Sequence, residues 1–191
     1  MPQIKIIILF TVIFYSNALA QDSTAQKKIF LSRIDVSYVF AGQIYNDSFI
    51  YKPGFSINIT ESIMLVDNLG VGIGMGYLSL NHDKFMPIYF EAIGYKRKKG
   101  NTPLIKIQAG YSLGWSNAEN SLSTYSFKGG AYVNAGFGRN IQINESYSVL
   151  FHLSYCHQFA KVKYHIFNGD EYSGTLNYDM LIISFGLIIN K

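Results

Sequence analysis

The chain has 191 residues, a formal net charge of +4, 15 tyrosines, 14 phenylalanines and one cysteine. Its length suits a single domain, and a charge this small and scattered argues against a nucleic-acid-binding protein. A lone cysteine excludes an internal disulfide, so the fold must be held by packing and hydrogen bonds.

Residues 1–20 have the features of an export signal. Lys5 gives a short positive region, Ile6 to Tyr15 form an uncharged and mostly apolar run, and Ala18-Leu19-Ala20 matches the small-x-small pattern that signal peptidase requires. The apolar run is too short for a membrane-spanning helix, which needs about 20 residues. We therefore expect cleavage after Ala20 and a mature domain of residues 21–191.

The composition of the mature chain indicates a membrane β-barrel. Aromatic residues make up 16% of the chain and charged residues only 15%, which is unusual for a water-soluble protein. Beyond residue 20, however, no stretch is long and apolar enough to predict a transmembrane helix. A barrel accounts for both observations, because only alternate residues of each barrel strand face lipid.

Segments of alternating polarity follow a polar leader at residues 21–28, and turn signals separate them. The predicted strands cover residues 29–40, 49–64, 70–80, 86–96, 103–115, 125–141, 147–160 and 179–191. Single-chain bacterial barrels have an even number of strands. The predicted fold is therefore all-β, an eight-stranded antiparallel up-and-down transmembrane β-barrel.

The strand at 179–191 shows the clearest alternation of faces. Large apolar side chains occupy every second position, at Leu181, Ile183, Phe185, Leu187 and Ile189. The strand at 103–115 has a similar apolar face, but its other face carries Lys106 and Gln108. A charged face cannot point at lipid, so it must point into a polar lumen.

The connections between predicted strands divide by length. Turns near Asp67, Gly100 and Asn144 are expected at the periplasmic end, together with both chain termini. The connections expected at the extracellular end cover residues 41–48, 81–85, 117–124 and 161–177, and the last is the longest. The basic run at 96–99 is interpreted as a solvated periplasmic turn that also holds lipid phosphates.

Five charged side chains are predicted to face the lumen, namely Arg33, Asp35, Glu91, Lys106 and Lys128. Placing Lys128 inside follows from placing its neighbour Phe127 on the lipid face. An eight-stranded barrel is just wide enough for side chains to fill it, and buried charges must pair. We expect Glu91 and Lys106, on neighbouring strands, to form such a pair in a plugged lumen.

No cofactor, metal or catalytic site is predicted. Glycines at every second position of residues 70–76 lie on one strand face, whereas a dinucleotide-binding loop needs a different spacing and a following helix. The possible metal ligands His152, Cys156, His157 and His165 do not share a site, because strand geometry separates them or turns them to opposite faces.

The segment His152-Leu153-Ser154 is similar to the His-x-Ser arrangement of an outer-membrane lipid A deacylase family, which also has eight strands. The resemblance covers only these residues. That family's site faces lipid near the outer rim, whereas His152 and Ser154 fall on the inferred lumen face, and the sequence does not identify the carboxylate partner. We interpret both residues as polar lining of the lumen.

Two longer segments resemble outer-membrane β-barrel proteins of the Bacteroidetes. One is the hairpin formed by Met86–Tyr95 and Leu104–Ser112, and the other is the glycine-rich strand Asn68–Tyr77; together they cover about a quarter of the mature chain. The family as a whole is similar to small OmpA/OmpW-like, porin-family barrels. This chain departs at its end, which is Ile189-Asn190-Lys191 rather than an aromatic residue.

The resemblance implies a protein of the outer membrane that contacts its lipid and lipopolysaccharide and requires the barrel assembly machinery. We expect no enzymatic activity, but a structural or surface-binding role through the long extracellular connection. The side chains expected to make contact there are those of Tyr164, His165, Phe167 and Tyr172. The alternatives are a small-solute or lipid channel, an outer-membrane lipid hydrolase, and a soluble periplasmic barrel with its apolar face inside.

Overall fold

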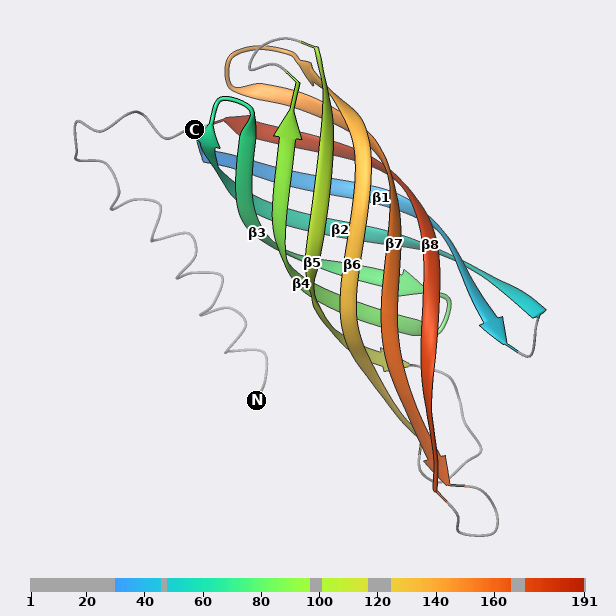
Figure 1. Ribbon diagram of the computed structural model, residues 1–191. Helices are drawn as coiled ribbons and strands as arrows, with labels where there is room; N and C mark the ends of the chain where they lie inside the picture. Colours follow the sequence, from blue (N-terminus) through green and yellow to red (C-terminus); the bar gives the residue numbers. More distant parts are fainter. Residues whose placement is uncertain (1–29, 46–47, 97–100, 117–124, 166–170, 191) are drawn as a thin grey trace.

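The computed structural model describes residues 30–45, 48–96, 101–116, 125–165 and 171–190, which form eight strands (Figure 1). In chain order the strands are β1 (Phe30–Tyr45), β2 (Ser48–Val66), β3 (Leu69–Leu80), β4 (Asp83–Tyr95), β5 (Thr102–Ser116), β6 (Tyr125–Gln142), β7 (Tyr147–His165) and β8 (Glu171–Asn190). Each strand pairs antiparallel with the next, and β1 pairs with β8, so the sheet closes into a barrel. The predicted fold is confirmed.

Several sequence predictions lie outside the described residues. They are the export signal at residues 1–20, the polar leader at 21–28, the basic residues and turn at 97–100, the connection at 117–124 and the contact residue Phe167. Among the residues that are described, none forms a helix with the length and hydrophobicity of a membrane span.

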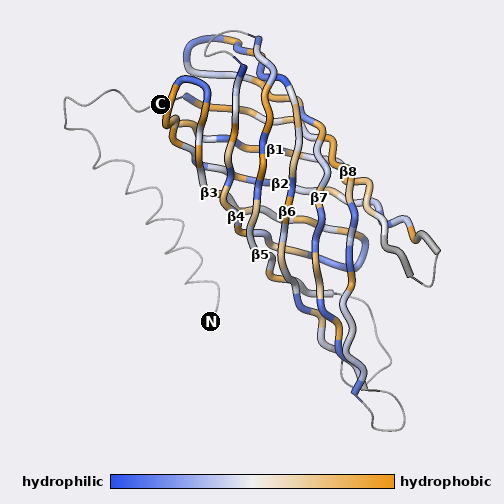
Figure 2. Tube along the Cα trace, in the orientation of Figure 1, coloured by the Kyte–Doolittle hydropathy of each residue, from blue (hydrophilic) through white to orange (hydrophobic). Residues whose placement is uncertain are grey.

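Exposed and buried residues alternate along the strands, and Figure 2 shows hydrophobic and hydrophilic stretches alternating along the same chain trace. On β8, Phe185 and Leu187 are 60% and 40% exposed, whereas Ser184 and Ile188 are 2% and 3% exposed. The outward apolar residues of all the strands form one band around the barrel, which we call the apolar belt. It includes Ile34, Val36, Ile57, Ile59, Ile73, Ile88, Phe90, Ile105, Ile107, Val133, Phe137, Phe151, Leu181, Ile183 and Phe185.

Glycine is required at a crowded position of the lumen wall in β3. The alternate glycines of β3 face the lumen, and the ring of Tyr89 occupies the space beside Gly74. A Cβ atom on Gly74 would lie 2.5 Å from that ring, closer than any real Cβ contact. The glycine-rich strand therefore makes room for a bulky side chain from β4.

Two predicted loops are shorter than expected, because strand pairing continues beyond the apolar belt. Within residues 161–177, β7 extends to His165 and pairs there with Glu171 of β8. Within residues 41–48, β1 extends to Tyr45 and pairs with β2. Backbone hydrogen bonds do not depend on apolar side chains, so these polar segments remain strands. They project from the barrel as separate arms (Figure 1).

A β-bulge in β6 overturns the prediction that Lys128 faces the lumen. The register between β6 and β7 shifts between Gly129 and Tyr132. An extra residue reverses the faces on one side of the bulge relative to the other. Phe127 is consequently 9% exposed and packs inside against Phe85, with 5.5 Å between ring centroids, while Lys128 is exposed outside.

Candidate functional site

The lumen contains three layers of side chains along the barrel axis. Toward the chain termini lies a terminus-side apolar cluster of Leu31, Ile93, Leu104, Leu150 and Ile188. Toward the opposite end lies a larger loop-side apolar cluster, formed by Val39, Ala41, Leu78, Leu80, Phe85, Tyr89, Phe127, Tyr132, Cys156, Ala160, Tyr178, Met180 and Ile182. A charged layer lies between the two clusters and is our candidate site.

Arg33 of β1 is the centre of the charged layer. Its Nε donates to Oδ2 of Asp35 at 2.8 Å, and its Nη1 donates to Oε1 of Glu91 at 2.9 Å. A further bond from Nη2 to the other oxygen of Glu91 makes this contact bidentate. The side chains of all three residues are at most 4% exposed. Such buried carboxylates stay charged only if a geometry of this kind compensates their lost hydration.

A chain of hydrogen bonds through uncharged side chains continues from Glu91 to β5 and β6. Gln108 Nε2 donates to Oε2 of Glu91 at 2.7 Å, and Gln108 Oε1 accepts from the hydroxyl of Tyr132 at 3.1 Å. The Tyr132 hydroxyl in turn accepts from Asn134 Nδ2 at 3.1 Å. The ring of Tyr132 stacks on that of Tyr89 with centroids 5.6 Å apart. Side chains from three strands, β4, β5 and β6, thus fill this part of the lumen.

Lys106 does not form the expected pair with Glu91. The register places Glu91 opposite Gln108, and Lys106 opposite Ile93. The Nζ of Lys106 instead lies 3.3 Å from Nε2 of His152 on β7. That same Nε2 is 3.5 Å from Oδ1 of Asp35. The partner of Lys106 is therefore His152 of β7, two strands away, rather than a carboxylate of the neighbouring strand β4.

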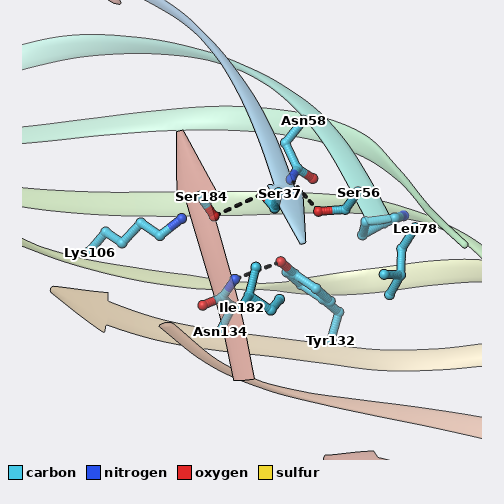
Figure 3. A pocket seen from close by; sticks show the side chains of 10 residues that line it. Ser37, Ser56, Asn58, Leu78, Lys106, Tyr132, Asn134, Ile182 and Ser184 are labelled. Carbon is cyan, nitrogen blue, oxygen red and sulfur yellow. Dashed lines mark hydrogen bonds between the residues drawn. The ribbon is translucent and has the colours of Figure 1, made fainter. Parts of the chain in front are cut away.

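A small polar cavity adjoins Lys106 on the loop side of the charged layer (Figure 3). The polar part of its lining consists of Ser37, Ser56, Asn58, Lys106, Tyr132, Asn134 and Ser184. Its free space is on the order of a single water molecule. Hydroxyl groups of Ser37 and Ser184 already bond each other at 2.8 Å. The cavity can hold water but not a solute.

The His152 and Ser154 side chains both face the lumen and are 1% and 2% exposed. Asp35 is the carboxylate beside His152 that the sequence did not identify. The Ser154 hydroxyl has no hydrogen-bond partner among the described residues, so His152 does not activate it. A nucleophile in this position has neither a base in contact nor access to lipid. Within the described residues, no group of three potential metal ligands converges.

Three of the four predicted contact residues lie on the arm formed by β7 and β8, namely Tyr164, His165 and Tyr172. The rings of Tyr164 and Tyr172 pack against each other with centroids 4.8 Å apart, and Tyr172 is 46% exposed. His165 is the last residue of β7. Phe167 lies outside the described residues.

Sequence reasoning missed two polar clusters. Inside the loop-side end, Oδ2 of Asp83 accepts from Nζ of Lys52 at 2.9 Å and from the Tyr178 hydroxyl at 2.8 Å. On the outer face, Asp179 accepts hydrogen bonds from Tyr155 and pairs with His157, whose Nδ1 lies 2.8 Å from its Oδ1. Lys52, Asp83 and Tyr178 lie on three strands that do not pair with one another, so they meet only across the closed lumen. His157 and Asp179 are brought together by the register of β7 with β8, and no sequence motif indicates either cluster.

The barrel is similar in fold to solved outer-membrane proteins. Neisserial surface protein A superposes with a TM-score of 0.57 at 12% identity, covering 84% of this chain and 96% of that one. OprG of Pseudomonas aeruginosa gives 0.56 at 12% identity, covering 86% and 96%. The N-terminal barrel domain of OprF from the same organism gives 0.51 at 12% identity, covering 83% and 97%.

No protein-family model matches the chain, and no curated protein matches its sequence. The identities to the solved structures are too low to carry function, so they establish the fold alone. The chain has the fold of the small eight-stranded outer-membrane β-barrels.

Proposed function

We propose that this chain is a non-enzymatic outer-membrane protein whose lumen is filled by side chains and whose surface arms make its contacts. The observation that carries the proposal is the charged layer closed between two apolar clusters. A transport path would need continuous polar space along the axis, and here each end of the polar layer is covered by packed apolar side chains.

Residence in the outer membrane is supported by the apolar belt, whose residues would be costly to expose to water. We propose that residues 1–20 are removed on export and that the barrel assembly machinery inserts residues 21–191. The finer assignment to a Bacteroidetes family rests on the segment resemblance alone. Membrane fractionation, migration of unheated samples on gels, and the mass of the mature protein test these points. Material that stayed soluble without detergent would contradict them.

A closed lumen predicts a specific electrical result. Purified protein in a planar lipid bilayer should give no steady conductance of nanosiemens size. Channel activity is the alternative function, and reproducible openings of that size would favour it. The protein's heat-dependent gel migration should be recorded on the same sample, to show that a sample without conductance was folded.

The arm formed by β7 and β8 is our proposed contact surface, with Tyr164, His165, Phe167 and Tyr172 as the contact residues. Paired aromatic rings offer a rigid surface for binding, since they lose little side-chain entropy. Protease treatment of intact cells should cleave between β7 and β8 if this end is extracellular. Cleavage only after the outer membrane is opened would place the arm in the periplasm.

A lipid hydrolase remains the least supported function. His152 and Ser154 are buried in the lumen and share no hydrogen bond. Incubating the folded protein with lipopolysaccharide and analysing released fatty acids tests this directly. Release that disappears in Ser154→Ala would contradict the non-enzymatic proposal.

A further inference from the structure

Two lysines face each other on the outer surface of the barrel. The register pairs Lys128 of β6 directly with Lys161 of β7, and both side chains are exposed. Cross-strand neighbours are close enough that like charges repel and destabilise the sheet. An anion that contacts both ammonium groups would remove this repulsion.

Nothing in the described part of the chain supplies that anion. No ion pair links Lys128 or Lys161 to a carboxylate among the described residues. By contrast, Lys163, two residues farther along β7, has its Nζ 2.6 Å from Oε1 of Glu171. The neighbouring lysine of the same strand is therefore neutralised, whereas the facing pair is not.

The bulge in β6 is what creates the pair. Without the extra residue between Gly129 and Tyr132, Lys128 would face the lumen and Phe127 would face outward. Bulges in natural sheets commonly re-aim a side chain and are preserved as functional features. Here the bulge places a second cation beside the one already present on β7.

The pair lies just beyond the apolar belt. Phe159, two residues before Lys161, is 38% exposed on the outer face. Tyr111 is 56% exposed, and its hydroxyl donates to the carbonyl oxygen of Gly129 at 3.3 Å, beside Lys128. Amphipathic tyrosines mark the level of lipid headgroups. Lysines at this level can lay their apolar stems along the wall and extend their ammonium groups toward headgroup phosphates.

We propose that Lys128 and Lys161 together bind a phosphate monoester of lipopolysaccharide. The inference rests on the proposed function, which puts this end of the barrel in the outer leaflet. A phosphate monoester carries about two negative charges near neutral pH, which matches two lysines. Each ammonium group provides three donors, and strand pairing holds both near one tetrahedral anion.

The test measures lipopolysaccharide binding by folded, full-length mature protein in detergent micelles. Lys128→Gln/Lys161→Gln should weaken binding about 30-fold, from the usual contribution of two basic residues near an anionic surface. Lys128→Arg/Lys161→Arg should bind like the wild type, since it retains both charges. The matched control is Lys163→Gln, which removes a neighbouring lysine already paired with Glu171 and should leave binding within about 2-fold.

Two further measurements identify the ligand. Enzymatically dephosphorylated lipopolysaccharide should bind the wild type and the double glutamine variant equally weakly, and millimolar inorganic phosphate should not compete. Equal binding of intact lipopolysaccharide by the wild type and the glutamine variant would overturn the proposal, as would full competition by free phosphate. Heat-dependent gel migration should be recorded for every sample. If the membrane-barrel proposal itself were wrong, no sample would show a folded form in detergent, whereas failure of the lysine proposal alone would leave every sample folded.

Discussion

Replacing Arg33 by methionine tests the charged layer at its centre. The substitution removes the partner of two buried carboxylates, leaving Glu91 with Gln108 and Asp35 with His152. Breaking a buried ion pair from one side typically costs about 3–5 kcal/mol, because the remaining charge stays buried without compensation. We expect Arg33→Met to lower the free energy of unfolding by this amount. Replacing Glu91 as well, in Arg33→Met/Glu91→Met, should recover part of the loss, since it removes one of the two uncompensated carboxylates and leaves only Asp35 without its arginine.

The free energy can be measured by denaturant titration of the barrel in lipid vesicles. Trp115 is the only tryptophan and is 39% exposed on the outer face, so its fluorescence reports contact with lipid. The control is Lys163→Met, which breaks an ion pair whose side chains are 55% and 47% exposed and should cost at most about 1 kcal/mol. An Arg33→Met loss no larger than this control, or a double variant less stable than Arg33→Met alone, would refute the reasoning.

Two other predictions use the packing of the lumen and the bulge. Gly74→Ala should lower the free energy of unfolding by about 1–3 kcal/mol through overpacking against Tyr89. The control is Gly94→Ala, whose Cβ would have no neighbour closer than 3.9 Å and which should cost less. Equal losses would contradict the crowding argument. Lys128→Cys, combined with Cys156→Ser, should react with a membrane-impermeant maleimide on intact cells, because residue 128 lies outside the barrel wall. Native Cys156 is fully buried and should react only after unfolding; labelling in the folded protein would contradict its placement.

The alternation of side chains along the chain was sufficient to predict the architecture. Segments such as residues 103–115 and 179–191 alternate with a period of two, so in a closed sheet their apolar face points either outward or inward. The charges at Arg33 and Lys106 lie on the other face, and in a barrel that contacts lipid that face must be inside. The strand number and the outward positions in β8 follow from this local pattern, because both depend on residues near one another in sequence. The closed ring was expected from the class of barrel, since its closing pair joins β1 to β8, which are far apart in the chain.

Partners across the lumen could not be predicted in the same way. Arg33 binds Glu91 from three strands away, a contact fixed only when the ring closes and the lumen side chains meet. Sequence reasoning paired Glu91 with Lys106 because their strands are neighbours. The stagger between those strands instead puts Gln108 opposite Glu91.

The sequence by itself determined that alternate residues face opposite sides of a barrel wall, because a strand turns each successive side chain to the other face. Only the tertiary structure showed that the bulge in β6 reverses this alternation and turns Lys128 outward. It also showed how far the arm formed by β7 and β8 extends. The bulge and the length of the arm both depend on hydrogen bonds between strands. These bonds join residues far apart in the chain, so the local alternation of polar and apolar residues does not predict them.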